Sequence, residues 1–424
     1  MRSVVLLLLL LGFAWRAPAQ EAQEDDDVSP YREMKTLARA IELVRQDYVD
    51  EGKTDYKQLT YGALRGMLEE LDPHSDFMDP NDFKGMQEDT KSEFGGLGVV
   101  VGMKNDRLTI VAPMEGTPGF RAGLLPDDVL LEIDGQSAER MTLRTAVNKL
   151  RGEPGTKVEL AVAREKEPGP LKFNLEREVI KVPSVRGTKI LSTGRGPRIG
   201  YVRVTQFSEP TGKEFSRALD ELEKQGMQAL VLDLRFNPGG LLTSAVEVAG
   251  EFLPSGSLVA YTEGRSAAAA RKYLAPGKGR KARAYPVAVL VNGSSASGAE
   301  IVAGALKDSG RALLVGETTF GKGSVQSVIS LPDGSAVRLT TAKYYTPGRQ
   351  LIHERGVTPH VLAPLTADEE ARLLALRRED DLPDGTEREV AVPVDDMPLQ
   401  RAADALRGVL LRAQEGTAAP SKQG

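Results

Sequence analysis

The stretch "YPVAVLVNGSSASGAEIVAGALKDSG", residues 285–310, determines how the largest part of this chain folds. Positions 287–291 are all apolar, which is typical of a strand buried on both faces of a sheet. Small polar residues then interrupt the run at 292–297, and apolar residues return at helical spacing from Ile301. The stretch therefore predicts a buried strand, a tight turn and a helix.

Other segments repeat this pattern. "RIGYVRV" (198–204) and "ALVLDLR" (229–235) are apolar runs without polar alternation, and "FNPGG" (236–240) turns the second run into a helix at 241–252. "RALLVGE" (311–317) is the strand that follows the opening stretch. Repeated strand–turn–helix units predict a mainly parallel, layered sheet, and such sheets bind ligands at the carboxyl ends of their strands.

The rest of the chain divides into segments with different residue patterns, and the whole sequence predicts an α+β multidomain protein. Residues 30–93 carry two helical patterns and predict an N-terminal helical region, whereas 94–178 alternate short strands and one helix in a compact α+β module. The layered core is expected at 179–365, with a long basic loop at 263–285. A C-terminal extension with an amphipathic helix (366–413) and a disordered tail (414–424) would follow.

Composition excludes several classes of protein. With 41% hydrophobic and 27% charged residues, the 424-residue chain is globular rather than fibrous or disordered. A net charge of −5 provides no basic excess for nucleic acid. The absence of cysteine excludes disulfides, a lipid-modified cysteine and thiol catalysis.

The N-terminus predicts export. Arg2 precedes an apolar run at 4–11, and Ala17-Pro18-Ala19 offers small residues at the positions that a signal peptidase reads. The run is too short to cross a bilayer comfortably, so we expect a cleaved signal peptide at 1–19 and a flexible leader at 20–29. The protein would then act in the periplasm or outside the cell, with peripheral attachment to the membrane left open.

A lysine in "VGETTFGKGSVQ" (315–326) raises the question of a nucleotide site, because Gly316, Gly321 and Lys322 fit the start of a phosphate-binding loop. Such a loop needs Ser or Thr after the lysine and then a helix. Gly323 follows instead, and then two β runs. We therefore expect no nucleotide, no other cofactor and no metal.

Lys322 can instead activate a serine if it is neutral. For half of it to be neutral at pH 7, its pKa must fall from about 10.4 to about 7, which costs roughly 4.6 kcal/mol. Burial supplies such a cost, and Lys322 lies between two glycines and near Phe320 and Val325, with no adjacent acid. The pattern is consistent with a buried lysine base.

Ser297 is a candidate partner, because it would stand at the start of the helix that follows the turn, where developing negative charge is favoured. A plain N-cap is the commonest role of serine at such a place, and Ser294 and Ser295 fit it equally well. Spacing alone does not decide among them. The three histidines, at 74, 353 and 360, are best explained as polar turn residues.

The motifs "S-A-S-G-A-E-I" and "T-F-G-K-G-S-V-Q" occur together, and their key residues are 25 positions apart (322 − 297). In this the chain resembles the carboxyl-terminal processing proteases, the tail-specific Ser/Lys peptidases of family S41, over roughly residues 30–365. The resemblance implies a crotonase-like ββα layered core, with Ser297 as nucleophile, Lys322 as general base and Gln326 as the residue that orients the lysine. It also implies an oxyanion hole made by the backbone N–H of Gly298 and that of Gly239 or Gly240.

The module at 94–178 then resembles a PDZ domain, with "GGLGVV" as its carboxylate-binding loop. The residues of that loop are Gly96, Leu97, Gly98 and Val99. The resemblance implies that protein or peptide substrates with free C-termini add beside the sheet as a strand. An adaptor protein and a homodimer through the helical N- or C-terminal segments are further implied partners.

The chain departs from the family pattern at a few positions: Gly298 stands where Ala is usual, Asp127 replaces a PDZ glycine, His360 replaces Asp, and "YTPGR" is one residue short. The resemblance predicts an exported, ATP-independent serine endopeptidase that recognises C-terminal tails. The alternative is a non-catalytic PDZ scaffold of the same fold. The complete set of Ser297, Lys322 and Gln326 argues against that alternative.

Overall fold

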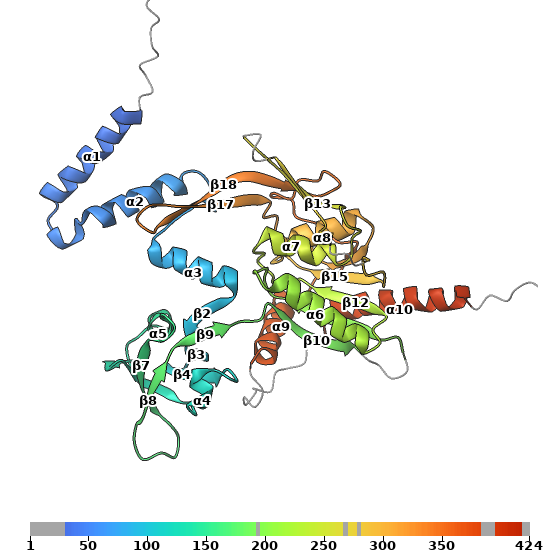
Figure 1. Cartoon of the computed structure of the whole chain (residues 1–424), viewed down its shortest axis with the longest axis horizontal. Helices are drawn as coiled ribbons and strands as arrows, with labels where there is room; N and C mark the ends of the chain where they lie inside the picture. Colours follow the sequence, from blue (N-terminus) through green and yellow to red (C-terminus); the bar gives the residue numbers. More distant parts are fainter. Residues whose placement is uncertain (1–29, 192–195, 266–269, 278–280, 383–394, 418–424) are drawn as a thin grey trace, which may run out of the picture. The chain divides into compact units, whose positions relative to one another are not determined.

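The structure is a computed structural model that describes residues 30–191, 196–265, 270–277, 281–382 and 395–417 (Figure 1). The predicted signal peptide and leader, and the predicted tail beyond residue 417, lie outside the described residues. The chain forms two compact units, residues 1–67 and residues 68–424. The first unit contains α1 (Pro30–Asp47), η1 (Glu51–Lys53) and most of α2 (Tyr56–Glu69), in agreement with the two helical patterns of the sequence.

The second unit opens with β1 (Asp76–Met78) and α3 (Pro80–Lys91). The α3 helix begins where the sequence predicts, because Pro80 suits its first turn and the Asp79 side chain accepts hydrogen bonds from the backbone N–H groups of Asn81 and Asp82. A two-stranded ribbon of β2 (Glu93–Gly96) and β9 (Glu178–Lys181) then brackets the PDZ-like module.

The PDZ-like module is an antiparallel six-stranded sheet with two short helices. Its strands are β3 (Val99–Lys104), β4 (Arg107–Pro113), β5 (Val129–Ile133), β6 (Gln136–Ser137), β7 (Lys157–Ala163) and β8 (Leu171–Glu176), and its helices are α4 (Pro118–Arg121) and α5 (Leu143–Leu150). Asn105 and Asp106, both with positive φ, make the tight turn between β3 and β4. The inward side chains of the sheet and of α5 form one core of their own.

The layered core is built on a second six-stranded sheet in the order β10-β11-β12-β15-β16-β19. Its strands are β10 (Val185–Leu191), β11 (Ile199–Val204), β12 (Ala229–Asp233), β15 (Val287–Val291), β16 (Ala312–Gly316) and β19 (Val361–Leu362). All pairs are parallel except the edge pair of β10 and β11, which is antiparallel. The prediction of a mainly parallel layered sheet is confirmed.

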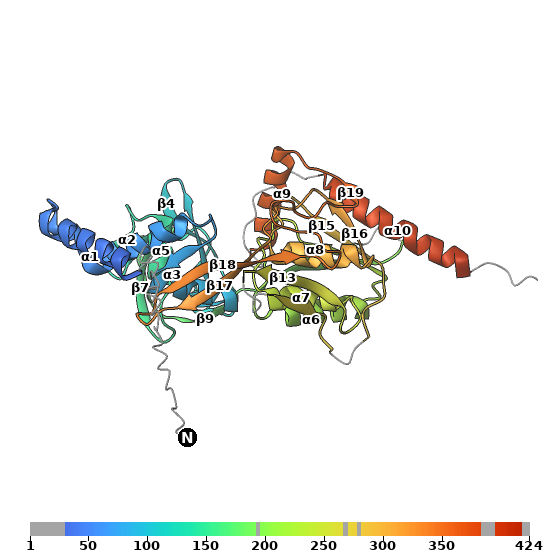
Figure 2. The same cartoon turned by 90° about the horizontal axis from the view of Figure 1, so that it is seen from above.

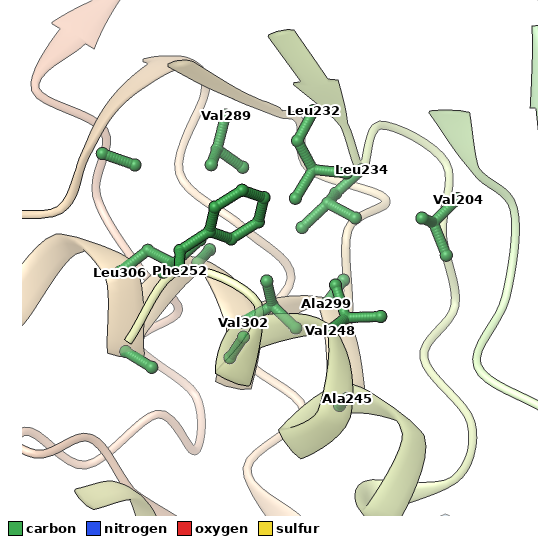
Figure 3. Close-up of a cluster of buried hydrophobic side chains, with 14 of the residues drawn as sticks. Val204, Leu232, Leu234, Ala245, Val248, Phe252, Val289, Ala299, Val302 and Leu306 are labelled. Atoms are coloured by element: carbon green, nitrogen blue, oxygen red, sulfur yellow. The ribbon is translucent and has the colours of Figure 1, made fainter. Parts of the chain in front are cut away.

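Helices cover both faces of this sheet, which explains why its strands have no polar alternation. On one face, α6 (Thr211–Lys224), α7 (Leu242–Gly250) and α8 (Gly298–Asp308) enclose a core in which Phe252 lies near Leu232, Val289 and Leu306 (Figure 3). On the other face, Ala402, Ala403 and Leu406 of α10 (Met397–Thr417) pack against the sheet (Figure 2).

A further sheet extends from the layered core. The long strand β18 (Ala336–Tyr345) pairs with β17 (Ser324–Ser330) on one edge and with β1 and β13 (Leu258–Gly264) on the other. The sequence predicts a loop over 263–285, but β14 (Arg271–Leu274) lies within that range and pairs with β13. The stretch "RKYL" is short and flanked by basic and small residues, so its pairing partner is not visible in local sequence.

The C-terminal part of the chain consists of α9 (Ala367–Asp380) and α10. The Thr366 side chain accepts a hydrogen bond from the backbone N–H of Glu369 and so caps α9. The α10 helix runs into the stretch predicted as a tail, since it ends at Thr417. Of the helices in the described ranges, none combines the length and the apolar character that crossing a bilayer requires.

Candidate active site

Ser297 lies at the turn between β15 and α8, at the carboxyl edge of the layered sheet, where the sequence places it. Its backbone has φ 54° and ψ −112°. A residue with a side chain rarely adopts a positive φ, and such strain costs about 1–3 kcal/mol. The strained turn holds Ser297 at the N-terminus of a buried helix, whose dipole stabilises negative charge.

The two neighbouring serines have other environments. Ser295 is fully buried, and its hydroxyl donates a hydrogen bond to the carbonyl of Leu234 at 2.8 Å and accepts one from the Asn292 N–H at 3.0 Å. Ser294 is exposed, and its N–H donates to the Asn292 side chain at 3.3 Å. Ser295 therefore joins the turn to the end of the adjacent strand β12, and the Ser294 backbone bonds within the turn.

Glu300 connects the Ser297 turn to the lysine loop. The sequence patterns above predict no role for this residue. Its buried carboxylate accepts hydrogen bonds from the N–H of Ser297 at 2.8 Å and from the N–H of Lys322 at 2.8 Å. It also accepts from the Gly321 N–H at 2.7 Å and from the Thr319 hydroxyl. Burial raises the pKa of Glu300, while these four donors favour its ionised form. The pattern S-x-x-E, a capping-box signature, was the available signal for this residue.

The backbone around Lys322 requires its two flanking glycines. Gly321 has φ 91°, and a Cβ atom added there would lie 3.1 Å from the Arg355 backbone nitrogen. A Cβ atom added at Gly323 would lie 2.2 Å from the backbone nitrogen of His353, which no real side chain tolerates. The lysine loop is therefore packed closely against residues 352–355, as its glycine content suggests.

The electrostatic surroundings of Lys322 favour its neutral form. The residue is half-buried, and burial lowers the pKa of its ammonium group, with a smaller contribution from the positive charge of Arg338. The pKa of His74 is lowered as well, first by burial and then by the charge of Lys322. The pairing of β1 with β18 explains this, because it aligns Asp76 with Arg338 and so brings the His74 turn to the lysine loop.

Gln326 lies on β17, which pairs with β18 in the sheet that also contains β1. Its side-chain amide nitrogen donates to the hydroxyl of Thr340 at 2.8 Å and to that of Ser324 at 3.1 Å. Its side-chain oxygen is buried and has no hydrogen-bond partner among the residues that the structure describes. The two donated bonds fix the orientation of the amide and leave one buried acceptor for a further donor.

The "NPGG" turn lies against Ser297. A Cβ atom added at Gly239 would lie 2.6 Å from the Ser297 Cβ and 2.9 Å from the Gly298 nitrogen, whereas one added at Gly240 would meet the carbonyl of Phe207 at 2.0 Å. Gly239 is therefore the glycine nearest the serine, although its N–H donates to the Asn237 side chain at 2.8 Å. This turn and the Ser297 turn are joined directly by the Ala296 N–H, which donates to the Asn237 carbonyl at 2.9 Å.

The PDZ-like module has a groove at its predicted carboxylate loop. Gly98 has φ 66°, and its carbonyl accepts hydrogen bonds from the Met114 N–H at 2.7 Å and the Thr117 hydroxyl at 3.1 Å. The groove is lined by Phe94, Gly96, Leu97, Gly98, Val99, Val101, Val147, Leu150 and Arg151. The sequence-predicted loop residues thus share one mostly apolar groove beside β3 and α5, and Arg151 stacks on Phe94 with 4.4 Å between its guanidinium carbon and the ring centroid.

His360 has a structural contact, whereas the buried Nδ1 atom of His353 has no hydrogen-bond partner among the described residues. The Nδ1 atom of His360 accepts a hydrogen bond from the Leu314 N–H at 3.0 Å, so the histidine makes an acceptor contact to β16 at the position where Asp is usual. Within the described ranges, no group of three or more His, Asp or Glu residues is placed to hold a metal ion. Lys322 is followed by the strand β17 and not by a helix, which does not match a phosphate-binding loop.

Replacing Glu300 with Gln should destabilise the chain by at least about 2 kcal/mol, because an amide presents one acceptor oxygen to four buried donors. Urea unfolding followed by circular dichroism measures this change. Glu221→Gln, on the exposed face of α6, is the matched control and should have no effect beyond about 0.5 kcal/mol. Equal midpoints for the two variants would show that the Glu300 carboxylate does not hold the two loops together.

Three family models match the chain. Residues 198–363 match peptidase family S41, residues 109–164 match the PDZ domain, and residues 14–82 match the N-terminal domain of the activating protease CtpB. The carboxy-terminal-processing protease of Bartonella bacilliformis is 39% identical over 348 residues, which cover 81% of this chain and 78% of that protein. The carboxy-terminal processing protease CtpA of Bacillus subtilis is 38% identical over 330 residues, which cover 78% of this chain and 68% of that protein.

Among solved structures, a Bacteroides fragilis protein assigned to the S41 proteases matches with a TM-score of 0.50 and 18% identity, covering 87% of this chain and 97% of that one. At this identity the likeness supports the fold alone. The family models and the sequence relatives together lead to one conclusion: this chain belongs to the S41 carboxy-terminal processing proteases, serine peptidases that carry a PDZ domain.

Proposed function

We propose that the chain is an exported, ATP-independent serine endopeptidase that cuts proteins with a Ser297–Lys322 dyad. The observation that carries the proposal is the Glu300 carboxylate, which accepts the backbone N–H of both residues and so joins two loops 25 positions apart in the chain (322 − 297). A lysine whose pKa is lowered by burial, and a serine on a strained strand-to-helix turn held by the same carboxylate, are the groups that this chemistry needs.

In the proposed mechanism, neutral Lys322 removes the proton from the Ser297 hydroxyl as its oxygen attacks the carbonyl carbon of the scissile bond. The resulting oxyanion accepts hydrogen bonds from the Gly298 N–H and from the N–H of Gly239 or Gly240. The Lys322 ammonium then protonates the leaving amine, which frees the new N-terminus. Water, deprotonated by Lys322, hydrolyses the acyl-enzyme and restores the serine.

Gln326 is proposed to orient the base. Its buried oxygen can accept a hydrogen bond from the Lys322 ammonium, while its nitrogen is already held by Thr340 and Ser324. Of the two candidate oxyanion glycines, proximity to Ser297 favours Gly239. The Gly239 N–H would have to exchange its bond with the Asn237 side chain for one with the oxyanion, so Gly240 remains the alternative.

Substrate selection is proposed to lie in the PDZ domain. The N–H groups of Leu97, Gly98 and Val99 would bind a terminal carboxylate, and the apolar groove between β3 and α5 would take the last side chain. The substrates would therefore be proteins and peptides with free C-termini. Export rests on the predicted signal at 1–19, and detection of a mature protein that begins at Gln20 outside the cytoplasm tests it.

A non-catalytic scaffold of the same fold is the second candidate. It needs neither a strained serine nor a half-buried lysine, and both features cost stability without giving a scaffold any benefit. The serine endopeptidase is therefore the favoured function.

Ser297→Ala and Lys322→Ala should each reduce digestion of casein by the mature protein by about 1,000-fold or more, since each removes one member of a catalytic dyad. Gel electrophoresis of timed digests measures this, with circular dichroism to verify folding. Activity that survives Ser297→Ala would mean another nucleophile. If the wild type stays inert even with a peptide that binds the PDZ domain, the scaffold is the better description.

The rate should also rise with pH as Lys322 loses its proton. Arg338→Gln removes a positive charge that lowers the Lys322 pKa, so the midpoint of the kcat/KM profile should move to higher pH while the alkaline plateau is kept. Lys343→Gln, the same charge loss at an exposed position of β18, is the control and should leave the midpoint in place. A wild-type profile that is flat from about pH 6 to 10 would exclude the lysine base.

Gly98→Val should reduce cleavage of peptides with a free C-terminus by about tenfold or more and spare amidated ones. The new Cβ atom would lie 2.3 Å from the Thr117 Cβ at a positive φ, which displaces the carboxylate loop. Paired kcat/KM measurements on the two peptide forms measure the effect. Gly169→Ala, where a Cβ atom meets nothing within 4 Å, is the control. Equal losses on both peptide forms would reject the carboxylate role.

A further inference from the structure

The described parts of segment 365–396 bond to the carboxyl ends of four neighbouring parallel strands of the layered sheet. This segment lies beyond the stretch that matches the S41 model, which ends at residue 363. From one side of the sheet to the other, the bonded pairs are Asp381 with Arg203, Arg377 with Asp233, Glu370 with Asn292, and the Leu365 N–H with Glu317. The described parts of the segment therefore follow the edge of the sheet that carries the active site.

The centre of these contacts is a buried group of four charges. The guanidinium of Arg235 binds both oxygens of Asp396, at 2.7 and 2.8 Å, and its other edge binds the fully buried Asp233, at 2.7 Å. Arg377 also binds Asp233 and donates to the carbonyl of Arg235 at 3.2 Å. Two carboxylates thus neutralise two guanidinium groups, and Tyr201 adds a hydrogen bond to Asp233 at 2.8 Å.

This charged group is continuous with the turn that carries the oxyanion glycines. Arg235 is followed by Phe236, which has φ 61°, and the Phe236 N–H donates to the Asn292 side-chain oxygen at 2.9 Å. The Asn292 side-chain nitrogen donates to Glu370 at 2.8 Å. Four residues after Arg235 (239 − 235), Gly239 lies against Ser297. The described parts of segment 365–396 therefore hold the start of the turn in two ways: directly at the Arg235 carbonyl, and through Glu370, which bonds the asparagine that holds the strained Phe236.

A buried ion pair is weak support for stability, because removing two charges from water costs as much as their attraction returns. The contribution of such a pair is to select one geometry. We propose that Arg377 and Asp396 are positioning residues of the peptidase: they fix the 236–240 turn so that its N–H groups face the oxyanion. The proposal rests on the proposed Ser297–Lys322 mechanism and assigns a catalytic purpose to a segment outside the S41 match.

The test compares the full-length mature protein with Asp396→Asn, which removes one of the four charges and leaves a buried guanidinium without its bidentate partner. Asp395→Asn is the matched control, since it makes the same change one residue earlier, where the carboxylate contacts the exposed Gln400. Arg377→Lys is a second, milder variant that keeps the charge and removes the planar fork. Two readouts are taken: hydrogen–deuterium exchange of peptides that span 234–241, and kinetics on a fluorogenic peptide built around a bond that the wild type cuts in β-casein.

For Asp396→Asn we expect faster exchange in 234–241 and a fall in kcat of about 10- to 100-fold, with KM within about twofold of the wild type. Arg377→Lys should show the same pattern with a smaller fall, and Asp395→Asn should match the wild type. A peptide aldehyde with the same sequence forms a tetrahedral adduct, and its affinity for Asp396→Asn should fall by the same factor as kcat.

Three results would overturn the proposal. Unchanged exchange in 234–241 in both variants would show that the segment does not hold the turn. Faster exchange spread evenly over the layered core would indicate a purely structural role. A loss carried by KM alone would place the effect in substrate binding. If the wild type shows no cleavage that depends on Ser297, the proposed mechanism fails, and the exchange data still decide whether the segment positions the turn.

Discussion

The carboxylate of Glu300 is the interaction on which the active-site architecture depends. Its two oxygens accept four hydrogen bonds from residues 297, 319, 321 and 322, and it is fully buried. A buried carboxylate is costly unless donors surround it, and a loop rich in glycine has no geometry of its own. Each therefore needs the other: the loops supply the donors, and the carboxylate supplies the geometry. The serine turn follows β15, and the lysine loop connects β16 of the same sheet to β17 of the other sheet. The Glu300 carboxylate aligns the two without any direct contact between them being required.

Strained backbone and buried polar groups occur together at the active site. Ser297 has a positive φ, Lys322 is half-buried with a lowered pKa, and Phe236 has a second strained backbone at the end of the adjacent strand. Such features persist only where the surroundings over-determine them. Here the surroundings are the layered sheet, which is covered on both faces, and the hydrogen bonds along its carboxyl edge. The stability of this layered core therefore keeps the strained site in place.

The sequence predicted the layered core well because strands buried on both faces, such as 287–291 and 229–233, are apolar runs without polar alternation, interrupted in the second only by its last residue, Asp233. Local patterns also predicted a serine at the strand-to-helix turn and a lysine between glycines, but they did not decide among Ser294, Ser295 and Ser297; the family resemblance singled out Ser297. Sequence patterns predicted no role for Glu300, because nothing in its spacing shows that N–H groups from a second loop converge on it. The strand β14 was missed because its stretch is short and basic, although its partner β13 is the strand just before it; the ion pairs of Asp396 were missed because their partners lie far away in the chain.

The second face of the layered sheet is covered by Ala402, Ala403 and Leu406 of α10, a helix that follows every strand of that sheet in the chain. Until they arrive, side chains of the four central strands, including Tyr201, Val231 and Leu290, have no cover on that side. A chain that has been synthesised only as far as β19 therefore cannot complete this domain, because an open apolar sheet face does not stabilise a strained site at its edge. The order of synthesis itself delays assembly of the peptidase until α10 has been made.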